Sequence, residues 1–168
     1  GDVEQKPTKA KRVRIHDSLK FDGIVVQYDE DYKTHFCPFC EKYFVTIGRH
    51  MTEQHSDQAE IAKINAMPRR KDQRNAINIL KFKGDHEHNL NVMEKGHGTL
   101  VVARKPPMDR IVNAGHYQPC PNCKRWMLRS QLADHQKVCL LKETKPNVKV
   151  SKAKLQKQSR HLLIAKSA

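Results

Sequence analysis

All five cysteines of this 168-residue chain fall in patterns that could ligate a metal ion. The first pattern consists of Cys37, Cys40, His50 and His55, and the second of Cys120, Cys123, His135 and Cys139. A C-x2-C turn places two thiolates on one side of a tight loop. A second pair of ligands separated by three or four residues then completes the tetrahedron that Zn²⁺ prefers. The spacings therefore predict two Zn²⁺ ions, each with four protein ligands.

Four protein ligands leave no coordination position for a water molecule, so we expect both zinc ions to be structural rather than catalytic. The chain also has no Gly-rich phosphate loop, and no nucleophile or carboxylate pair is set apart by its context. We therefore expect no enzymatic activity. Five further residues, His86, His88 and His97 with Asp85 and Glu87, would make a third metal site conceivable. Solvated or capping roles are the stronger expectation for those histidines.

The composition argues against one large core. Apolar residues make up 38% of the chain, aromatic residues 6% and charged residues 30%. Modules this poor in apolar surface rarely fold unaided, so the metal would supply much of their folding free energy. The predicted fold class is small α+β zinc-stabilised modules with disordered basic tails. Cysteines at ligand spacings favour a reducing compartment, and the absence of a long apolar run favours a soluble, intracellular protein.

The elements around the ligands divide the chain into five predicted segments. These are a disordered basic tail (1–18), a first metal module (19–58), a basic linker (59–110), a second metal module (111–141) and a basic tail with a possible helix (142–168). Residues 19–28 are β-prone and predict a strand leading into the first module. The linker predicts a helix ending before Pro68, a second ending at Gly84, a third over about 85–95, and a strand over 99–103. This linker is too apolar and regular for a flexible tether, so we expect it to hold the modules in a defined relation.

Residues 37–55 resemble the zinc-finger family with two Cys and two His ligands, a ββα unit. Phe44 and Ile47 stand where the family places its aromatic and helical core residues, but three residues are missing between them. In the family that stretch carries the base-contacting first turn of the helix. The resemblance thus implies an intact zinc core with a shortened reading surface, on which Thr46 and Arg49 remain. A structural or protein-binding role is the favoured expectation for this finger.

Residues 120–139 resemble the Cys-Cys-His-Cys variants of the same fold. Trp126 and Leu132 would form its core, and Ser130 would cap its helix. The candidate nucleic-acid contacts on or before its helix are Lys124, Arg125, Arg129 and Gln131. Arg and Gln can pair with base edges and Lys with phosphates, although the same residues also suit an ordinary solvated helix face.

Charge is distributed unevenly along the chain, which carries a net charge of +14. Residues 21–59 hold 3 Lys/Arg against 7 Asp/Glu, whereas residues 60–110 hold 11 against 6 and residues 140–168 hold 8 against 1. The linker contributes four more candidate contacts, Arg69, Arg70, Lys71 and Arg74. A basic field of this kind attracts polyanions, and nucleic acid is the leading one for a zinc-finger protein. The cluster Lys9–Arg14 suits nuclear import, which predicts a nuclear location.

The stretch from Cys37 to Cys139 resembles a paired-finger segment of uncharacterised animal proteins, some connected with tyrosine-recombinase mobile elements. The matching residues include the Arg-rich helix, His88-Asn89, Gly96-x-Gly98 and Arg104. No recombinase Arg/His/Tyr set can be located, so this resemblance implies no activity. The leading hypothesis is zinc-dependent binding of double-stranded DNA through the second finger and the basic linker. The alternatives are a protein-interaction module, which could be part of a larger mobile-element-derived protein, and RNA binding.

Overall fold

The computed structural model describes residues 23–27, 34–105, 107, 109, 112–142 and 150–164. The predicted tail 1–18, with its cluster Lys9–Arg14, lies outside these residues. The helices are α1 (Ile47–Gln54), α2 (Ala59–Asn65), α3 (Arg70–Lys95), α4 (Leu132–His135) and α5 (Lys152–Ile164), with short 3₁₀ turns η4 (Ala114–His116) and η5 (Arg129–Gln131). The strands are β1 (Ile24–Gln27), β2 (His35–Phe36), β3 (Tyr43–Phe44), β4 (Gly98–Val101), β5 (Tyr117–Pro119) and β6 (Trp126–Leu128). The fold is therefore the predicted small α+β type, with short strands and helices.

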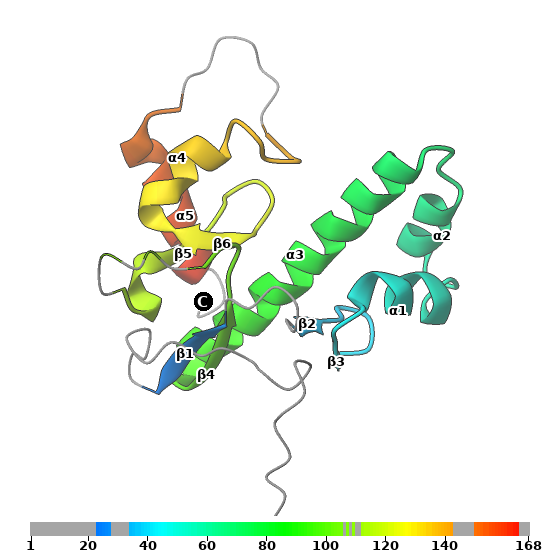
Figure 1. The fold of residues 1–168 in the computed structure, drawn as a ribbon, viewed down its shortest axis with the longest axis horizontal. Coiled ribbons are helices and arrows are strands. Elements are labelled where there is room, and N and C mark those ends of the chain that lie inside the picture. Colours follow the sequence, from blue (N-terminus) through cyan, green and yellow to red (C-terminus); the bar gives the residue numbers. More distant parts are fainter. Residues whose placement is uncertain are drawn as a thin grey trace, which may run out of the picture.

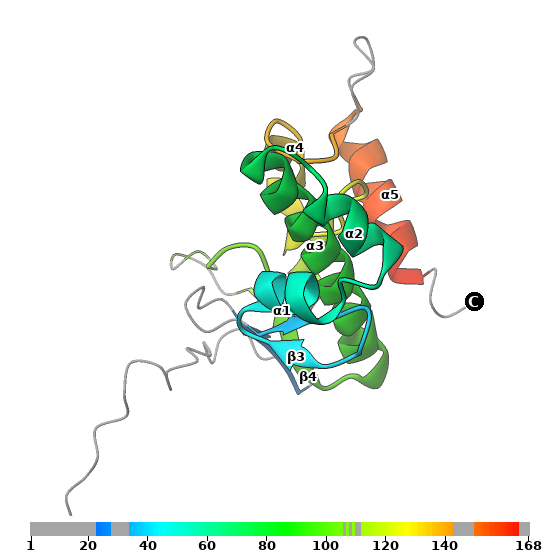
Figure 2. The same cartoon turned by 90° about the vertical axis from the view of Figure 1, so that its right-hand side faces the viewer.

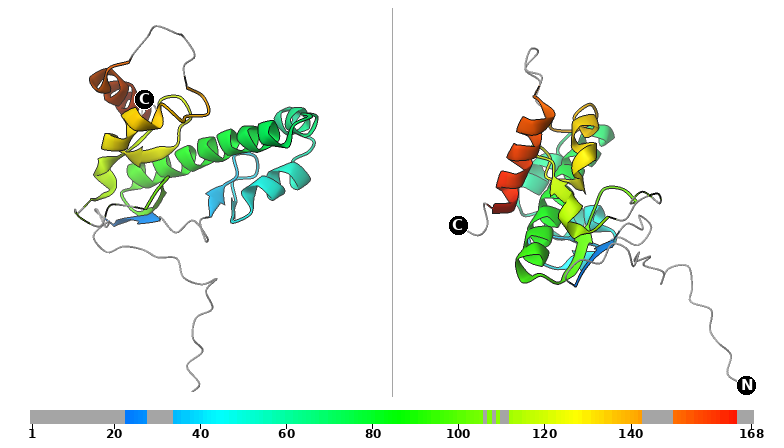
Figure 3. Two further views of the ribbon diagram at one scale, coloured as in Figure 1. Left: turned by 45° about the horizontal axis from the view of Figure 1, so that its top comes forward. Right: turned by 90° about the vertical axis from the view of Figure 1, so that its left-hand side faces the viewer.

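The long helix α3 organises the molecule, as Figure 1 shows. We name residues 34–55 the first module and residues 117–139 the second module. The first module and α2 lie along the N-terminal part of α3, and the second module with α5 lies on its other side (Figure 1, Figure 3). Ala76, Ile77 and Leu80 pack toward the first module. Phe82 belongs to the apolar cluster of the second, and helical periodicity places it on the opposite face of α3.

One helix replaces the two that the sequence predicts around Gly84. We expected Gly84 to end a helix and a new one to begin at about residue 85, but α3 continues without interruption from Arg70 to Lys95. Gly84 serves packing instead, because a Cβ atom there would lie 2.1 Å from the carbonyl oxygen of Phe36. The helix ends at Gly96, whose φ of +75° is the left-handed conformation that favours glycine. This agrees with the predicted end of the third linker helix at about residue 95.

A cluster of polar residues directly after Gly84 joins α3 to both modules. The Asp85 carboxylate binds the imidazole of His35 at 2.6 Å and accepts the amide N–H of Phe36 at 3.3 Å. Next to it, His86 Nδ1 accepts the indole N–H of Trp126 at 3.0 Å. Two adjacent residues of α3 therefore hold one module each, which explains how the helix fixes the position of both.

Strands β1 and β4 form a parallel two-stranded sheet whose partners are more than 70 residues apart in the chain. The strand predicted over residues 19–28 thus exists within residues 24–27, but it pairs with β4 rather than with the hairpin that follows it. The fully buried Asn89 side chain donates to the carbonyl of Val101 and accepts its N–H, both at 2.9 Å. This closes the other edge of β4. Val26 and Leu100 then form a core with Trp126 of the second module.

Helix α5 packs back onto the second module. The sequence predicts a possible helix in this basic tail, but no contact of that helix with the second module. Instead, Leu155 is buried in the apolar cluster of the second module, and the Ser159 hydroxyl donates to the carbonyl of Pro119 at 2.6 Å. Figure 2 shows α5 beside α4. The described part of the predicted C-terminal tail is thus ordered by its own apolar stripe. No helix among the described residues is long and apolar enough to cross a membrane.

Candidate metal centres

The first module places its two cysteines in a tight loop between β2 and β3. The amide N–H of Cys37 donates to the carbonyl of Lys42 at 2.9 Å, and that of Glu41 donates to the carbonyl of Cys37 at 2.9 Å. Glu41 closes the loop with a φ of 60°. Strand β3 then leads into α1, which carries His50, and His55 follows at the C-terminal cap. Buried Ile47 and Met51 hold this helix against the loop.

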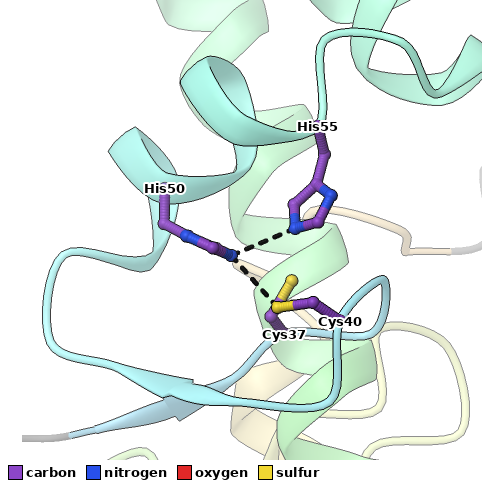
Figure 4. A group of neighbouring side chains, drawn as sticks. All are labelled: Cys37, Cys40, His50 and His55. Atoms are coloured by element: carbon purple, nitrogen blue, oxygen red, sulfur yellow. Dashed lines mark hydrogen bonds between the residues drawn. The ribbon is translucent and has the colours of Figure 1, made fainter.

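The four side chains of the first module converge on one point (Figure 4). Cys40 Sγ lies 3.3 Å from His50 Nε2, and His50 Nε2 lies 3.1 Å from His55 Nε2. Zn–S bonds of about 2.3 Å and Zn–N bonds of about 2.0–2.1 Å give tetrahedron edges of roughly 3.5 Å for S···N and roughly 3.3 Å for N···N. The observed separations match those edges, so the group has the dimensions of a tetrahedral metal site.

The surroundings of His50 favour the neutral imidazole that a metal ion needs. Its ring stacks on Phe44 with 3.5 Å between the ring centroids. Desolvation by burial, followed by the positive fields of His55 and Lys42, lowers the pKa of His50 from its ordinary value. Desolvation also raises the pKa of the buried Cys37 thiol, because burial disfavours the charged thiolate. A bound cation would compensate the charge of that thiolate.

The second module repeats the loop between β5 and β6. Cys120 N–H donates to the carbonyl of Arg125 at 2.8 Å, and Lys124 N–H donates to the carbonyl of Cys120 at 3.0 Å, with Lys124 at a φ of 68°. Helix α4 carries His135, and Cys139 follows four residues later. Cys120 Sγ lies 3.8 Å from Cys139 Sγ, and Cys123 Sγ lies 3.3 Å from His135 Nε2. The S···S separation equals the edge of about 3.8 Å expected for tetrahedral zinc thiolates.

Hydrogen bonds couple the ionisable side chains of the second group, so that the thiolate of Cys120 is favoured over that of Cys123. Hydrogen bonds from Cys123 and Cys139 depress the pKa of Cys120, which concentrates negative charge on its sulfur. Hydrogen bonds to Cys120 and Cys139 raise the pKa of His135 to about 9. Gln136 donates its amide to Cys120 Sγ at 3.4 Å and accepts from Asn122 at 2.9 Å. This supporting role of Gln136 was not predicted from the sequence, where its place between His135 and Cys139 is the only signal for it.

The eight predicted ligands form the two Cys/His groups that the structure brings together among its described residues. Both groups could hold a metal ion. The linker histidines form no third group there: His88 joins the Tyr43 hydroxyl at 2.7 Å to the Thr99 carbonyl at 2.6 Å, and His86 accepts from Trp126. The sequence favoured solvated or capping roles for these histidines, but His86 and His88 instead join α3 to neighbouring elements.

The predicted nucleic-acid contacts fall into two places. Arg69, Arg70, Lys71 and Arg74 are all exposed at the start of α3. The other four lie on the second module, where Arg129 is exposed on η5.

Three of those four residues also have structural roles. Lys124 donates to the carbonyl of Pro121 at 3.0 Å, and the Arg125 guanidinium lies 4.9 Å from the centre of the Phe82 ring. Gln131 accepts the N–H of Leu128 at 3.1 Å, so Gln131 rather than the predicted Ser130 caps this turn.

A groove of about 520 Å³ separates α3 from the second module. Its polar lining residues are Asn75, Asn78, Arg104, Arg125, Ser130, Gln131, Asp134, His135 and Lys137, and its apolar ones include Phe82 and Met127. Two of the predicted contacts, Arg125 and Gln131, therefore meet α3 across this groove. Lys71 lies on the same helical face as Asn75 and Asn78.

Comparison with family models, with curated proteins and with solved structures gave no match. The resemblances of the two Cys/His groups to zinc fingers, and of residues 37–139 to a paired-finger segment, therefore stay predictions carried by the residues themselves.

Proposed function

We propose that both Cys/His groups bind Zn²⁺ and that each makes a ββα-type zinc finger. The agreement between the ligand separations and the edges of a zinc tetrahedron supports this assignment. Zn²⁺ would be held by Cys37, Cys40, His50 and His55 in the first finger and by Cys120, Cys123, His135 and Cys139 in the second. Bound there, it would supply folding free energy to modules with small cores. Four protein ligands favour a structural role over an enzymatic one.

We further propose that the protein binds nucleic acid, with double-stranded DNA in the nucleus as the leading target. The observation that carries this proposal is the cluster of exposed basic side chains at the start of α3, Arg69, Arg70, Lys71 and Arg74. Arg104, Arg125 and Lys137, which line the groove between α3 and the second module, add positive charge along that groove. Exposed lysine and arginine side chains gathered in this way suit contact with phosphates. The resemblance to mobile-element proteins fits a DNA target but implies no reaction.

The test of this function measures the affinity of the zinc-loaded chain for duplex DNA by fluorescence anisotropy, at low and at physiological salt. We expect affinity to fall steeply as salt rises, because bound phosphates release counterions when Lys and Arg neutralise them. A double variant, Lys71→Glu with Arg74→Glu, should weaken binding and reduce the salt slope. The matched control, Lys63→Glu on the exposed side of α2, should change affinity much less. Affinity that is absent, or independent of salt, would refute the DNA-binding proposal.

A protein-binding role for the first module is the second candidate. Tyr43 and Val45 are exposed by 51% and 54%, respectively, on the surface of this module. The surrounding residues 21–59 are net acidic, which disfavours contact with phosphates. A partner captured by the wild-type chain and lost with Val45→Glu, at unchanged DNA affinity, would support this role.

A further inference from the structure

The groove between α3 and the second module is too small for a duplex, whose major groove alone is about 12 Å wide. Its volume of about 520 Å³ lies instead in the range of about 300–1,000 Å³ that is typical of small-ligand sites. A second cavity of about 280 Å³ adjoins it, lined by Lys81, Asp85 and His35. Phe82 and Arg125 line both. The dimensions thus fit one flat ring system with an attached polar group.

A supported guanidinium lies at the boundary between these two spaces. Arg125 lies over the Phe82 ring at 4.9 Å and donates to the carbonyl of Ala103 at 3.5 Å. Phe82 itself is only 8% exposed, so its position is fixed by the core. Nucleobases stack on arginine guanidinium planes as well as on aromatic rings. An arginine held in this way is already oriented for such stacking.

Amide side chains line the helical wall of the groove. Asn75 and Asn78 lie one turn apart on α3, and both face the groove. An amide offers a donor and an acceptor together, which is the pairing that the edge of a base requires. On the opposite wall, Gln131 adds a third amide. This wall is therefore suited to hydrogen bonding with a base rather than to contact with a purely apolar ligand.

Two cationic side chains line the inner cavity, where a phosphate would lie. Lys81 and Arg125 line it, together with His35, whose Nδ1 binds Asp85 at 2.6 Å. Arg104 and Lys137 line the outer groove, and Lys137 is 3.5 Å from Asp134. The cationic side chains outnumber the two carboxylates, which gives the paired spaces charge complementarity to a phosphate attached to a base.

We propose that this groove takes one unpaired nucleotide of a DNA strand, with its base stacked on Arg125 and its phosphate toward Lys81. This inference rests on the proposed DNA binding and specifies its substrate as a duplex with a single-stranded extension or an extruded base. The exposed basic residues at the start of α3 then contact the adjoining duplex, and the groove holds the strand that leaves it.

The test compares a blunt DNA duplex with the same duplex carrying a single-stranded extension, at equal salt. We expect the extended duplex to bind about tenfold more tightly, since stacking of one base on a side chain supplies a factor of that order. Asn78→Trp and, separately, Asn75→Trp fill the groove and should abolish this preference while leaving affinity for the blunt duplex unchanged. The matched control Asn65→Trp, at the exposed end of α2, should retain it. Circular dichroism and zinc content establish that each variant is folded.

Three outcomes would overturn the inference. One is equal affinity for the blunt and the extended duplex in the wild-type chain, and the second is a preference that survives in both groove-filling variants. In either case DNA binding itself would stand. The third is competition by a free deoxynucleoside monophosphate as strong as that by the extended duplex, which would assign the groove to a free nucleotide. Loss of all DNA binding in the wild-type chain would instead refute the proposed function.

Discussion

The two modules share one loop but differ in what surrounds it. In each, the first cysteine donates its N–H to the residue five positions later, at 2.9 Å in the first and 2.8 Å in the second. In each, the residue after the second cysteine has a positive φ, 60° at Glu41 and 68° at Lys124. The C-x2-C segment therefore fixes the ligand geometry locally, whatever it packs against.

Packing distinguishes the modules. Three ligands of the first group are partly exposed, and its apolar cluster is confined to the loop, α1, α2 and one face of α3. All three cysteines of the second group are buried, and Leu155 of α5 packs in the same cluster. Strand β6 also contributes Trp126 to the core with β1 and β4. Two Cys/His groups of similar loop geometry therefore differ widely in how much of the fold packs against them.

The largest expected difference comes from removing one ligand in each module. If the second group holds zinc as proposed, Cys120→Ser should release that ion and unfold the second module together with α5 and the β1–β4 core. Structural zinc supplies about 10–16 kcal/mol of apparent binding free energy, as much as the whole stability of a typical domain. Cys37→Ser should instead unfold the first module while the β1–β4 core persists. Zinc stoichiometry and hydrogen exchange of the β4 and α5 amides measure the contrast.

Equal hydrogen-exchange protection of the β4 and α5 amides in Cys120→Ser and Cys37→Ser would contradict this asymmetry. So would retention of two zinc ions per chain in either variant. Met127→Leu, a volume-conserving change at a buried position of the second module, is the matched control and should cost less than about 1.5 kcal/mol.

The same contrast between local and distant contacts explains what the sequence could predict. The ligand sets, and the α+β class that follows from them, depend on residues within about 20 positions of each other, so spacing alone identifies them. Helix α2 was likewise predictable from its apolar period and from Pro68. The continuity of α3 through Gly84 depends on Phe36, and the pairing of β1 depends on β4. The docking of α5 depends on Pro119, 40 residues before Ser159. A single sequence gives no signal for contacts so distant.

A second test separates close packing from backbone strain on α3. Gly84→Ala places a Cβ atom 2.1 Å from the Phe36 carbonyl oxygen, so the first module must shift away from the helix. We expect a loss of about 2–3 kcal/mol, in the range of an overpacked core. Gly96→Ala is the control, because its Cβ meets nothing within 4 Å and only the φ of +75° opposes it. It should cost about 1 kcal/mol. Denaturant unfolding compares the two, and a cost at Gly84 no larger than at Gly96 would contradict the packing role.

Asp85 and His86 allow the two attachments to α3 to be broken separately. Asp85→Ala leaves His35 and the Phe36 amide without their buried acceptor, and His86→Ala leaves the Trp126 indole without its own. Each should cost about 1–3 kcal/mol, the penalty of a buried polar group without a partner. Asp85→Ala should increase hydrogen exchange in β2 and α1, and His86→Ala should increase it in β5 and β6. Identical exchange patterns in the two variants would show that α3 does not hold the modules separately.

The smallest expected effect concerns the residue that closes each loop. Glu41 and Lys124 adopt the left-handed conformation without being glycine, which costs about 1 kcal/mol or more for a residue with a Cβ. Glu41→Gly should relieve that strain and stabilise the first module by about 0.5 kcal/mol, after the larger backbone entropy of glycine is subtracted. Lys124→Gly relieves the same strain but also removes the hydrogen bond from the Lys124 ammonium to the Pro121 carbonyl. Lys124→Gly should therefore stabilise the second module by less than Glu41→Gly stabilises the first, or not at all. Thermal unfolding of both variants would measure this difference, and a larger gain at Lys124 would mean that its hydrogen bond contributes no stability.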